Sequence, residues 1–252
     1  MHVLSRLSLL STLLCASLAH AESFPEPIRQ LQDKGAVIKG RFETPGGLQG
    51  YAAEYQNNAM ALYLTEDGKH VLVGTLFDDQ GQDLSAEPLE RLVYGPMGEV
   101  VWGQLAQSAW IADGRDDAPQ TLYVFSDPNC PYCTLFWEQV RPWVTSGKVQ
   151  VRHVMVGIIR ADSLGKSAAL LAAKEPVKAL ADHERAGKRS SLAPLTPIPE
   201  ALGKRLEANQ ALMQSLGLSA TPAVFYRDAQ GRLQSLQGAP GGARLAAVLG
   251  KP

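Results

Sequence analysis

The sequence predicts a two-domain protein: a small domain of one helix and an antiparallel sheet, then a connecting helix, then a larger α/β domain. Three observations support this organisation. The 252 residues exceed the ~150 typical of one domain. The first third contains short strand-like runs separated by turn residues. The remainder follows the order strand, helix, strand, a helical block, two strands and a helix.

The balance of charge and the number of cysteines exclude several classes of protein. The chain has 24 Lys and Arg against 25 Asp and Glu, a net charge of -1, which argues against a general nucleic-acid binder. Its three cysteines, Cys15, Cys130 and Cys133, are too few for a disulfide framework or a four-thiolate metal site. Their spacing is therefore more informative than their number.

The first 21 residues have the pattern of a secretory signal. Arg6 precedes an apolar run from Leu7 to Leu18, and Ala19–His20–Ala21 has the small-x-small pattern of a cleavage site. The apolar run is too short to span ~30 Å of hydrocarbon, which disfavours the alternative of an uncleaved anchor. The residue before Cys15 is not small, so a lipid attachment there is also disfavoured. We expect an exported mature chain beginning at Glu22.

The expected organisation of the whole chain follows from these patterns. It consists of a signal peptide at residues 1–21, an N-terminal domain at 22–86, a linker helix at 87–114, and a second domain at 115–252 with a helical insertion at about 161–216.

The N-terminal domain is predicted from one helix and four strands. Gly35 closes a helical pattern, and Asp67–Gly68 between two apolar runs indicates a hairpin. The expected elements are a helix at 28–34 and strands at 36–42, 48–55, 59–65 and 71–77. A sheet this small leaves an edge strand, which a second copy of the chain could cover. Dimerisation through this domain is the hypothesis, and a monomer with a blunted edge is the alternative.

The second part of the chain predicts an α/β sheet with helices on its faces. A connecting helix is expected at 88–111, broken at Gly95–Pro96, and a polar turn cluster follows at 113–119. Residues 121–125 form an uninterrupted apolar run, typical of a strand buried on both faces. The remaining expected elements are helices at 134–144, 163–186, 200–216 and from 241, and strands at 149–156, 223–226 and 233–237.

The pair Cys130 and Cys133 allows three interpretations. Two inert buried cysteines are one, and half of a zinc site is the second. Zinc would need closely spaced partners, but the histidines of the mature chain are scattered singly at His70, His153 and His183. A c-type haem site would need His directly after Cys133, where Thr134 stands. A thiol–disulfide active site is the interpretation that fits best.

The local physics supports a redox pair. Pro131 suits the first helical position, which places Cys130 at the N-cap, where unpaired N–H groups and the helix dipole favour a thiolate. Such placement lowers a cysteine pKa from ~8.5 to roughly 3.5–7.5. We expect Cys130 to be the nucleophile, and Cys133, one turn further, to resolve a mixed disulfide. An exported dithiol meets an oxidising setting and needs an external source of electrons.

With these residues, the mature chain resembles the dimeric periplasmic disulfide isomerase and reductase family of DsbC and DsbG. The shared features are the exported chain, the small N-terminal domain, the linker helix, and Cys130–Pro131–Tyr132–Cys133 after a buried strand. Thr221–Pro222–Ala223 matches the cis-proline loop of the family. The Pro-Tyr pair, with Phe136–Trp137 beyond it, is more similar to DsbG than to DsbC.

The resemblance implies a fold and a set of site residues. It implies a cystatin-like dimerisation domain, a thioredoxin-fold catalytic domain with a helical insertion, and a V-shaped homodimer. It implies that Thr221–Pro222 is cis beside Cys130 and offers backbone groups to a substrate, while Pro131 and Tyr132 tune the redox pair. Neither a metal nor another cofactor is implied.

One position departs from the pattern of many thioredoxin-fold enzymes. They carry an acid six residues before the first cysteine, and this chain has Val124 there. Asp127 is nearer to the pair, but a turn residue is expected to be solvated or capping rather than to tune a thiol. Of the aromatic residues near the motif, Tyr132 is the best candidate for substrate contact, Trp137 another, and Phe136 is expected in the core.

The leading functional hypothesis is a periplasmic enzyme that reduces or isomerises disulfides of exported proteins. The resemblance to DsbG adds reduction of sulfenylated cysteines and regeneration by a membrane thiol reductant of the DsbD type. The alternatives are a DsbA-like dithiol oxidant, which the separate N-terminal domain argues against, and a holdase chaperone with secondary redox activity.

Overall fold

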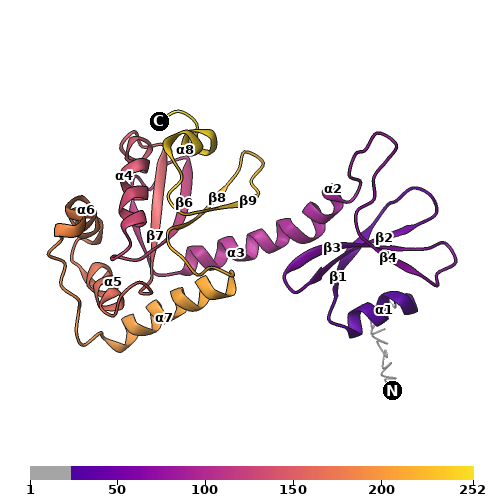
Figure 1. The fold of residues 1–252 in the computed structure, drawn as a ribbon, viewed down its shortest axis with the longest axis horizontal. Helices are drawn as coiled ribbons and strands as arrows, with labels where there is room; N and C mark the ends of the chain where they lie inside the picture. The colour runs from indigo at the N-terminus through magenta and orange to yellow at the C-terminus, as the bar shows by residue number, and fades with distance from the viewer. Residues whose placement is uncertain (1–23) are drawn as a thin grey trace, which may run out of the picture. The chain divides into compact units, whose positions relative to one another are not determined.

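The computed structural model of the protein describes residues 24–252, so the expected signal segment and Cys15 lie outside the described residues. Contacts divide the chain into two compact units, the first ending at Leu89 and the second beginning at Glu90 (Figure 1). Each unit has its own sheet and its own apolar core.

The first unit is a helix packed on a four-stranded antiparallel sheet of order β1-β2-β3-β4. Its elements are α1 (Glu26–Asp33), β1 (Val37–Phe42), β2 (Gln49–Tyr55), β3 (Asn58–Leu64), β4 (Val71–Val73) and α2 (Ala86–Leu89). Ile28 of α1 packs against Tyr51, Leu62 and Leu64, which fixes the helix on the sheet. The helix and the first three strands therefore lie within two residues of the predicted positions, and the fourth strand begins where it is predicted.

Strand β4 is shorter than the sequence predicts. The apolar run reaches residue 77, but pairing with β3 ends at Val73. Gly74 has a φ of +154°, a conformation that favours glycine, and it turns the chain out of the ladder. The side chains of Leu72, Val73 and Phe77 are more than half exposed at this edge of the sheet.

The second unit is built on a five-stranded sheet of order β5-β7-β6-β8-β9, in which only β6 and β7 are parallel. Its strands are β5 (Trp110–Asp113), β6 (Gln120–Ser126), β7 (Val149–Met155), β8 (Ala223–Arg227) and β9 (Leu233–Gln237). Its helices are the π-helical η1 (Glu90–Tyr94), α3 (Gly95–Gln107), α4 (Pro131–Thr145), α5 (Ser163–Ala172), α6 (Pro176–Ala186), the 3-10 helix η2 (Gly187–Arg189), α7 (Glu200–Ser215) and α8 (Gly242–Leu249).

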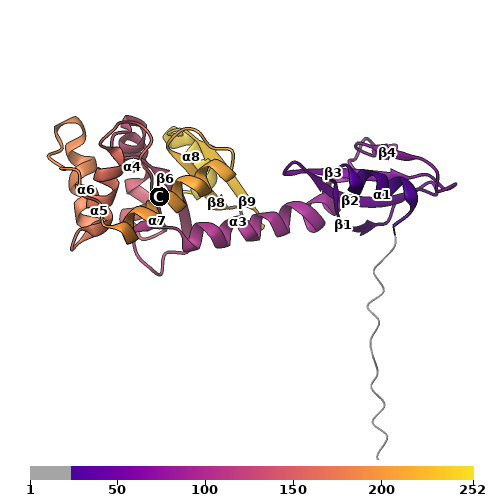
Figure 2. The same ribbon diagram turned by 90° about the horizontal axis from the view of Figure 1, so that it is seen from below.

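The central strand β6 is buried on both faces, as its apolar sequence predicts. Leu122 and Val124 face a core that includes α4 and α8, whereas Tyr123 and Phe125 face a core that includes α3 and α7 (Figures 1 and 2). Helices α5, α6 and α7 form a further apolar cluster with Met155 at the end of β7. The sheet is thus covered on both sides, and the carboxyl end of β6 leads directly into α4.

The connecting helix differs from the prediction at its C-terminal end and at Gly95–Pro96. It ends at Gln107 rather than Ile111, and residues 110–113 form the edge strand β5 beside β7. This register buries Ile111 against α5, α6 and α7, which a continued helix would not do. Gly95–Pro96 does not interrupt the helical run of residues 86–107 but marks the change from the π-helical η1 to α3.

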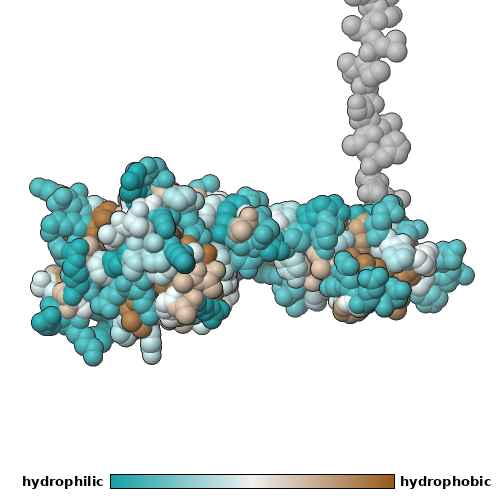
Figure 3. Space-filling model, turned by 90° about the horizontal axis from the view of Figure 1, so that it is seen from above, coloured by the Kyte–Doolittle hydropathy of each residue, from teal (hydrophilic) through white to brown (hydrophobic). Residues whose placement is uncertain are grey.

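No helix of residues 24–252 is long and apolar enough to cross a membrane. Figure 3 shows hydrophobic residues on the drawn face in small patches separated by hydrophilic ones.

The close approach of β7 to α5 makes a stability prediction. A Cβ on Gly157 would lie 2.5 Å from the backbone of Leu164. We expect Gly157→Ala to destabilise the second unit by about 2 kcal/mol, because the backbone must move apart. Gly203→Ala in α7 is the control and should stabilise by up to ~1 kcal/mol, since its Cβ meets only Ile198 at 4.0 Å.

Urea unfolding followed by tryptophan fluorescence measures both changes, because all four tryptophans lie in the second unit. Equal unfolding midpoints for the two variants would contradict the steric account.

Candidate active site

The end of β6 positions Cys130 at the start of α4. After Ser126 the chain makes a turn in which the N–H of Cys130 donates to the carbonyl of Asp127 at 3.0 Å. Cys130 is the N-cap, with extended φ and ψ of -88° and 112°, and Pro131 is the first helical residue. The thiol therefore lies at the helix N-terminus, as the sequence predicts.

The two sulfurs lie beside the loop that enters β8. Cys130 and Cys133 are free thiols and are only 4% and 3% exposed. The thiol of Cys130 donates to the carbonyl oxygen of Thr221 at 3.2 Å. The Thr221–Pro222 peptide bond is cis, as the family resemblance implies. The structure thus brings together the predicted cysteine pair and the predicted proline loop, which are 91 residues apart in sequence.

The environment gives the two thiols opposite proton affinities. A hydrogen bond from Cys133 lowers the pKa of Cys130 to about 6; burial opposes this shift, and Thr221 with the N–H groups of Tyr132 and Cys133 assists it. Burial, and then the hydrogen bond with Cys130, raise the pKa of Cys133 well above its ordinary value. At neutral pH the pair therefore consists of an N-cap thiolate with a protonated thiol beneath it.

Exposed apolar side chains flank the site. Tyr132 is 62% exposed, and Leu135 lies one turn further along α4. Ile158 and Ile159, in the loop after β7, are also exposed. We call these four residues the apolar rim. Phe136, in contrast, is fully buried in the core, as predicted.

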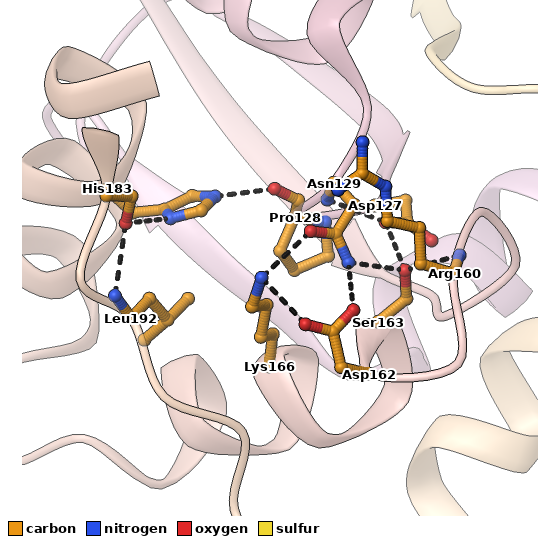
Figure 4. Close-up of polar contacts among 10 residues, drawn as sticks. Asp127, Pro128, Asn129, Arg160, Asp162, Ser163, Lys166, His183 and Leu192 are labelled. Carbon is orange, nitrogen blue, oxygen red and sulfur yellow. Dashed lines mark hydrogen bonds and ion pairs between the residues drawn. The ribbon is translucent and has the colours of Figure 1, made fainter. Parts of the chain in front are cut away.

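Asp127 holds the two segments of the apolar rim together. It is 1% exposed, so the expectation of a solvated turn residue was wrong. Its Oδ2 accepts the N–H groups of Ile158 and Ile159 at 2.6 and 2.9 Å. Its Oδ1 accepts the N–H of Asn129 and the hydroxyl of Ser163, both at 2.8 Å (Figure 4). The contact with Asn129 lies before the helix, and α4 has no side-chain cap, so the expected capping role is wrong as well. The other bonds of Asp127 go to the loop after β7 and to α5.

A second set of contacts fixes the residue that precedes Cys130. The amide of Asn129 donates to Asp162 at 2.8 Å and to Ser163 at 2.9 Å. Lys166 donates to the side-chain Oδ1 of Asn129 and forms an ion pair with Asp162, each at 2.9 Å (Figure 4). The start of α5 therefore holds the turn that leads into the cysteine pair.

His183, which the sequence did not mark as a site residue, fixes Pro128, the remaining residue of the turn. Its Nε2 lies 2.7 Å from the carbonyl oxygen of Pro128, so this nitrogen carries the proton and donates it. Its Nδ1 faces the hydroxyl of Ser190 at 2.6 Å. Burial lowers the pKa of His183, in keeping with a neutral ring. The contact spans 55 residues, and no local pattern could reveal it.

The far side of α4 carries a buried ionic pair. Trp137, a candidate for substrate contact, is buried and donates its ring N–H to Asp113 at 2.9 Å. Arg141 forms a close ion pair with Asp113 and lies over the Trp137 ring at 4.1 Å. Burial opposes ionisation, but the neighbouring His153 and Arg141 hold the pKa of Asp113 well below its usual range.

Within residues 24–252, no three His, Cys, Asp or Glu side chains are grouped so that they could hold a metal ion.

The second unit is an α/β domain that has a dithiol at a helix N-cap. A cis-proline loop contacts the first sulfur. These features define the class of thioredoxin-fold thiol–disulfide exchange proteins. The family described as the thioredoxin-like domain matches residues 111–251, in agreement with this class.

Two similar proteins identify the family of this chain. A thiol:disulfide interchange protein DsbG from Pseudomonas aeruginosa is 65% identical over 240 residues, which cover 95% of this chain and 94% of that protein. The DsbG of Escherichia coli K12 is 39% identical over 237 residues, covering 94% and 96%. The chain belongs to the DsbG family of thiol:disulfide interchange proteins.

A solved structure of Proteus mirabilis ScsC in a transitional conformation shares the fold. It has a TM-score of 0.50 at 23% identity and covers 66% of this chain and 88% of that one.

The environment of Cys130 predicts its reactivity with pH. Alkylation of the reduced protein, and the ultraviolet absorbance of the thiolate, should titrate with a midpoint at about 6. Cys133→Ala should raise this midpoint, because the thiol of Cys133 is the largest stabilising contact. A midpoint near the ordinary ~8.5 in the parent protein would contradict the assignment of the N-cap thiolate.

Proposed function

We propose that the protein reduces and isomerises disulfides of exported proteins, with Cys130 as the nucleophile and Cys133 as the resolving thiol. The observation that carries this proposal is the asymmetry of the pair. Cys130 lies at the helix N-cap beside Thr221, in surroundings that lower its pKa to about 6, whereas Cys133 is buried one turn below and its pKa is raised. A thiolate whose pKa is close to the ambient pH combines ionisation with nucleophilicity.

The reaction balances in two steps. The thiolate of Cys130 attacks a substrate disulfide, a bond forms between the two sulfurs, and the second substrate sulfur leaves as a thiolate that takes up a proton. If a substrate thiol then attacks, the disulfide is isomerised with no net electron transfer. If Cys133 attacks, it loses its proton, the Cys130–Cys133 disulfide forms, and the substrate is reduced by two electrons.

A sulfenylated substrate follows the same route. Attack of Cys130 on the sulfenic sulfur forms the same mixed disulfide and releases the oxygen as water. Resolution by Cys133 leaves the pair oxidised, so each reduction needs two electrons from another dithiol. A membrane thiol reductant of the DsbD type supplies them in this proposal.

Substrate recognition is assigned to backbone and apolar groups. Thr221 and Pro222 lie against Cys130 and offer an extended chain its hydrogen-bond partners. Tyr132 and the rest of the apolar rim contact the side chains that flank the reacting cysteine. Pro131 fixes the first turn of α4 and, with Tyr132, tunes the pair. None of these contacts needs a cofactor.

The compartment and the assembly are part of the same proposal. The signal pattern of residues 1–21 directs the chain to the periplasm, where disulfides of exported proteins form. The unpaired edge of β4, with Leu72 and Val73 exposed, supports a homodimer in which the first unit of a second copy covers this edge.

Trapping tests the catalytic roles. Cys133→Ser removes the resolving thiol, so mixed disulfides between Cys130 and exported proteins should accumulate and disappear on addition of a reductant. The matched control is Cys130→Ser with Cys133→Ser, which should trap nothing. A folded Cys133→Ser protein that traps no partner would overturn the proposal. A pair found mostly oxidised in the periplasm would indicate a dithiol oxidant instead.

The dimer is tested at the β4 edge. Leu72→Asp with Val73→Asp places charge on the exposed edge and should halve the mass measured by sedimentation. Val100→Asp is the control, because this α3 side chain is equally exposed but lies in the other unit. A dimer that survives the double substitution would show that the edge is not the interface.

A further inference from the structure

The sheet beneath the cysteine pair has no acid at the position where an acid would serve the buried thiol. Val124 of β6 packs in the core with α4. Its partner on β7 is His153, which points to the same face of the sheet. His153 is buried, and among the described contacts its Nε2 has no hydrogen-bond partner and lies 3.6 Å from Asp113.

A buried acid reaches the cysteine pair from another element. Glu184 lies on α6, in the helical insertion, and is 3% exposed. Its Oε2 accepts the hydroxyl of Thr134 at 2.6 Å. Thr134 directly follows Cys133, and its N–H donates to the carbonyl of Cys130 at 3.3 Å. The carboxyl group of Glu184 is therefore connected, by a hydrogen bond from Thr134, to the first turn of α4.

The charged groups around Glu184 separate its role from that of Asp113. Burial raises the pKa of Glu184, and the charge of Cys130 raises it further, while Thr134, His153 and Arg141 lower it. Asp113, in contrast, is held ionised by Arg141. Of these two buried acids near α4, Asp113 lies in surroundings that favour its ionised form, whereas the surroundings of Glu184 raise its pKa.

Solvent reaches the outer side of this cluster. A cavity of about 460 Å³ is lined by residues of α4 and α6 together with Asp113. Its other charged lining residues are Arg141, Glu175, Lys178 and Arg185. Solvent therefore reaches Asp113 and the outer side of the contact between α4 and α6.

We propose that Glu184 is a positioning residue for thiol–disulfide exchange, which acts through Thr134 and through its charge to link the ionisation of Cys130 to its own protonation. It supplies, from the helical insertion, the acid that position 124 lacks. This inference rests on the proposed function, since it assigns a proton partner to that same site.

The coupling between Glu184 and Cys130 accounts for the protons that move when the mixed disulfide forms. While Cys130 is a thiolate, its charge favours a protonated Glu184. When Cys130 forms the mixed disulfide, this charge leaves with the substrate sulfur. Glu184 then releases its proton, and the departing substrate thiolate takes one up. The reciprocal effect is that an ionised Glu184 disfavours the thiolate of Cys130.

Glu184→Gln is the direct test. Glutamine keeps an oxygen that accepts the Thr134 hydroxyl but carries no charge. The thiolate titration of Cys130 should move to lower pH, and the thiolate fraction below the midpoint should rise by about threefold or more. The reduction potential should become more oxidising, because the reduced form gains stability. Glu207→Gln, on the exposed face of α7, should leave both values unchanged.

Thr134 provides the second variant. Thr134→Val removes the hydroxyl and should also change the thiolate titration, whereas Thr134→Ser should restore it. The effects of Glu184→Gln and Thr134→Val should not add in the double variant, since one contact joins them. Circular dichroism confirms that each variant is folded.

An unchanged titration and potential in folded Glu184→Gln would overturn this inference, as would additive effects in the double variant. Neither result would affect the proposed function, because trapping through Cys130 would still succeed. Failure of trapping, in turn, would overturn the proposed function whatever the titration shows.

Discussion

The position of the Cys130 sulfur is the constraint on which the arrangement of the second unit depends. Cys130 has to lie at the N-cap of α4 and at the same time 3.2 Å from the carbonyl of Thr221. Both conditions are met because β6 pairs with β7 on one side and with β8 on the other. The end of β6 leads into α4, and the loop that enters β8 then lies beside it. Burial of β6 on both faces keeps these two points fixed relative to each other.

The helical insertion holds the turn between β6 and α4. Each residue of that turn has a partner outside it: Asp127 binds the loop after β7, Asn129 binds α5, and Pro128 binds His183 of α6. Buried polar groups are costly unless they are paired, so these contacts stabilise only one arrangement of the turn. A single arrangement gives Cys130 the same hydrogen-bond partners in every molecule. The insertion is therefore part of the active site although neither cysteine belongs to it.

Local sequence patterns predict the parts of this site that local forces determine. The apolar run of β6, the Pro131 start of α4 and the Thr-Pro loop before β8 each follow from adjacent residues. The edge strand β5 does not, because Trp110–Asp113 also fits the end of a helix and becomes a strand only by pairing with β7. The burial of Asp127 and the contacts of His183 and Glu184 also escape prediction, since their partners lie about 30 to 55 residues away.

The difference between the two thiols also determines which redox state of the pair is favoured. A pKa of about 6 at Cys130 stabilises the reduced pair, because the thiolate exists only in that form. Stabilising the reduced pair makes the corresponding disulfide the more readily reduced partner in exchange. The site alone therefore favours accepting electrons rather than giving them. In the proposed function, net reduction of substrates therefore needs a dithiol of lower potential that restores the pair after each turnover.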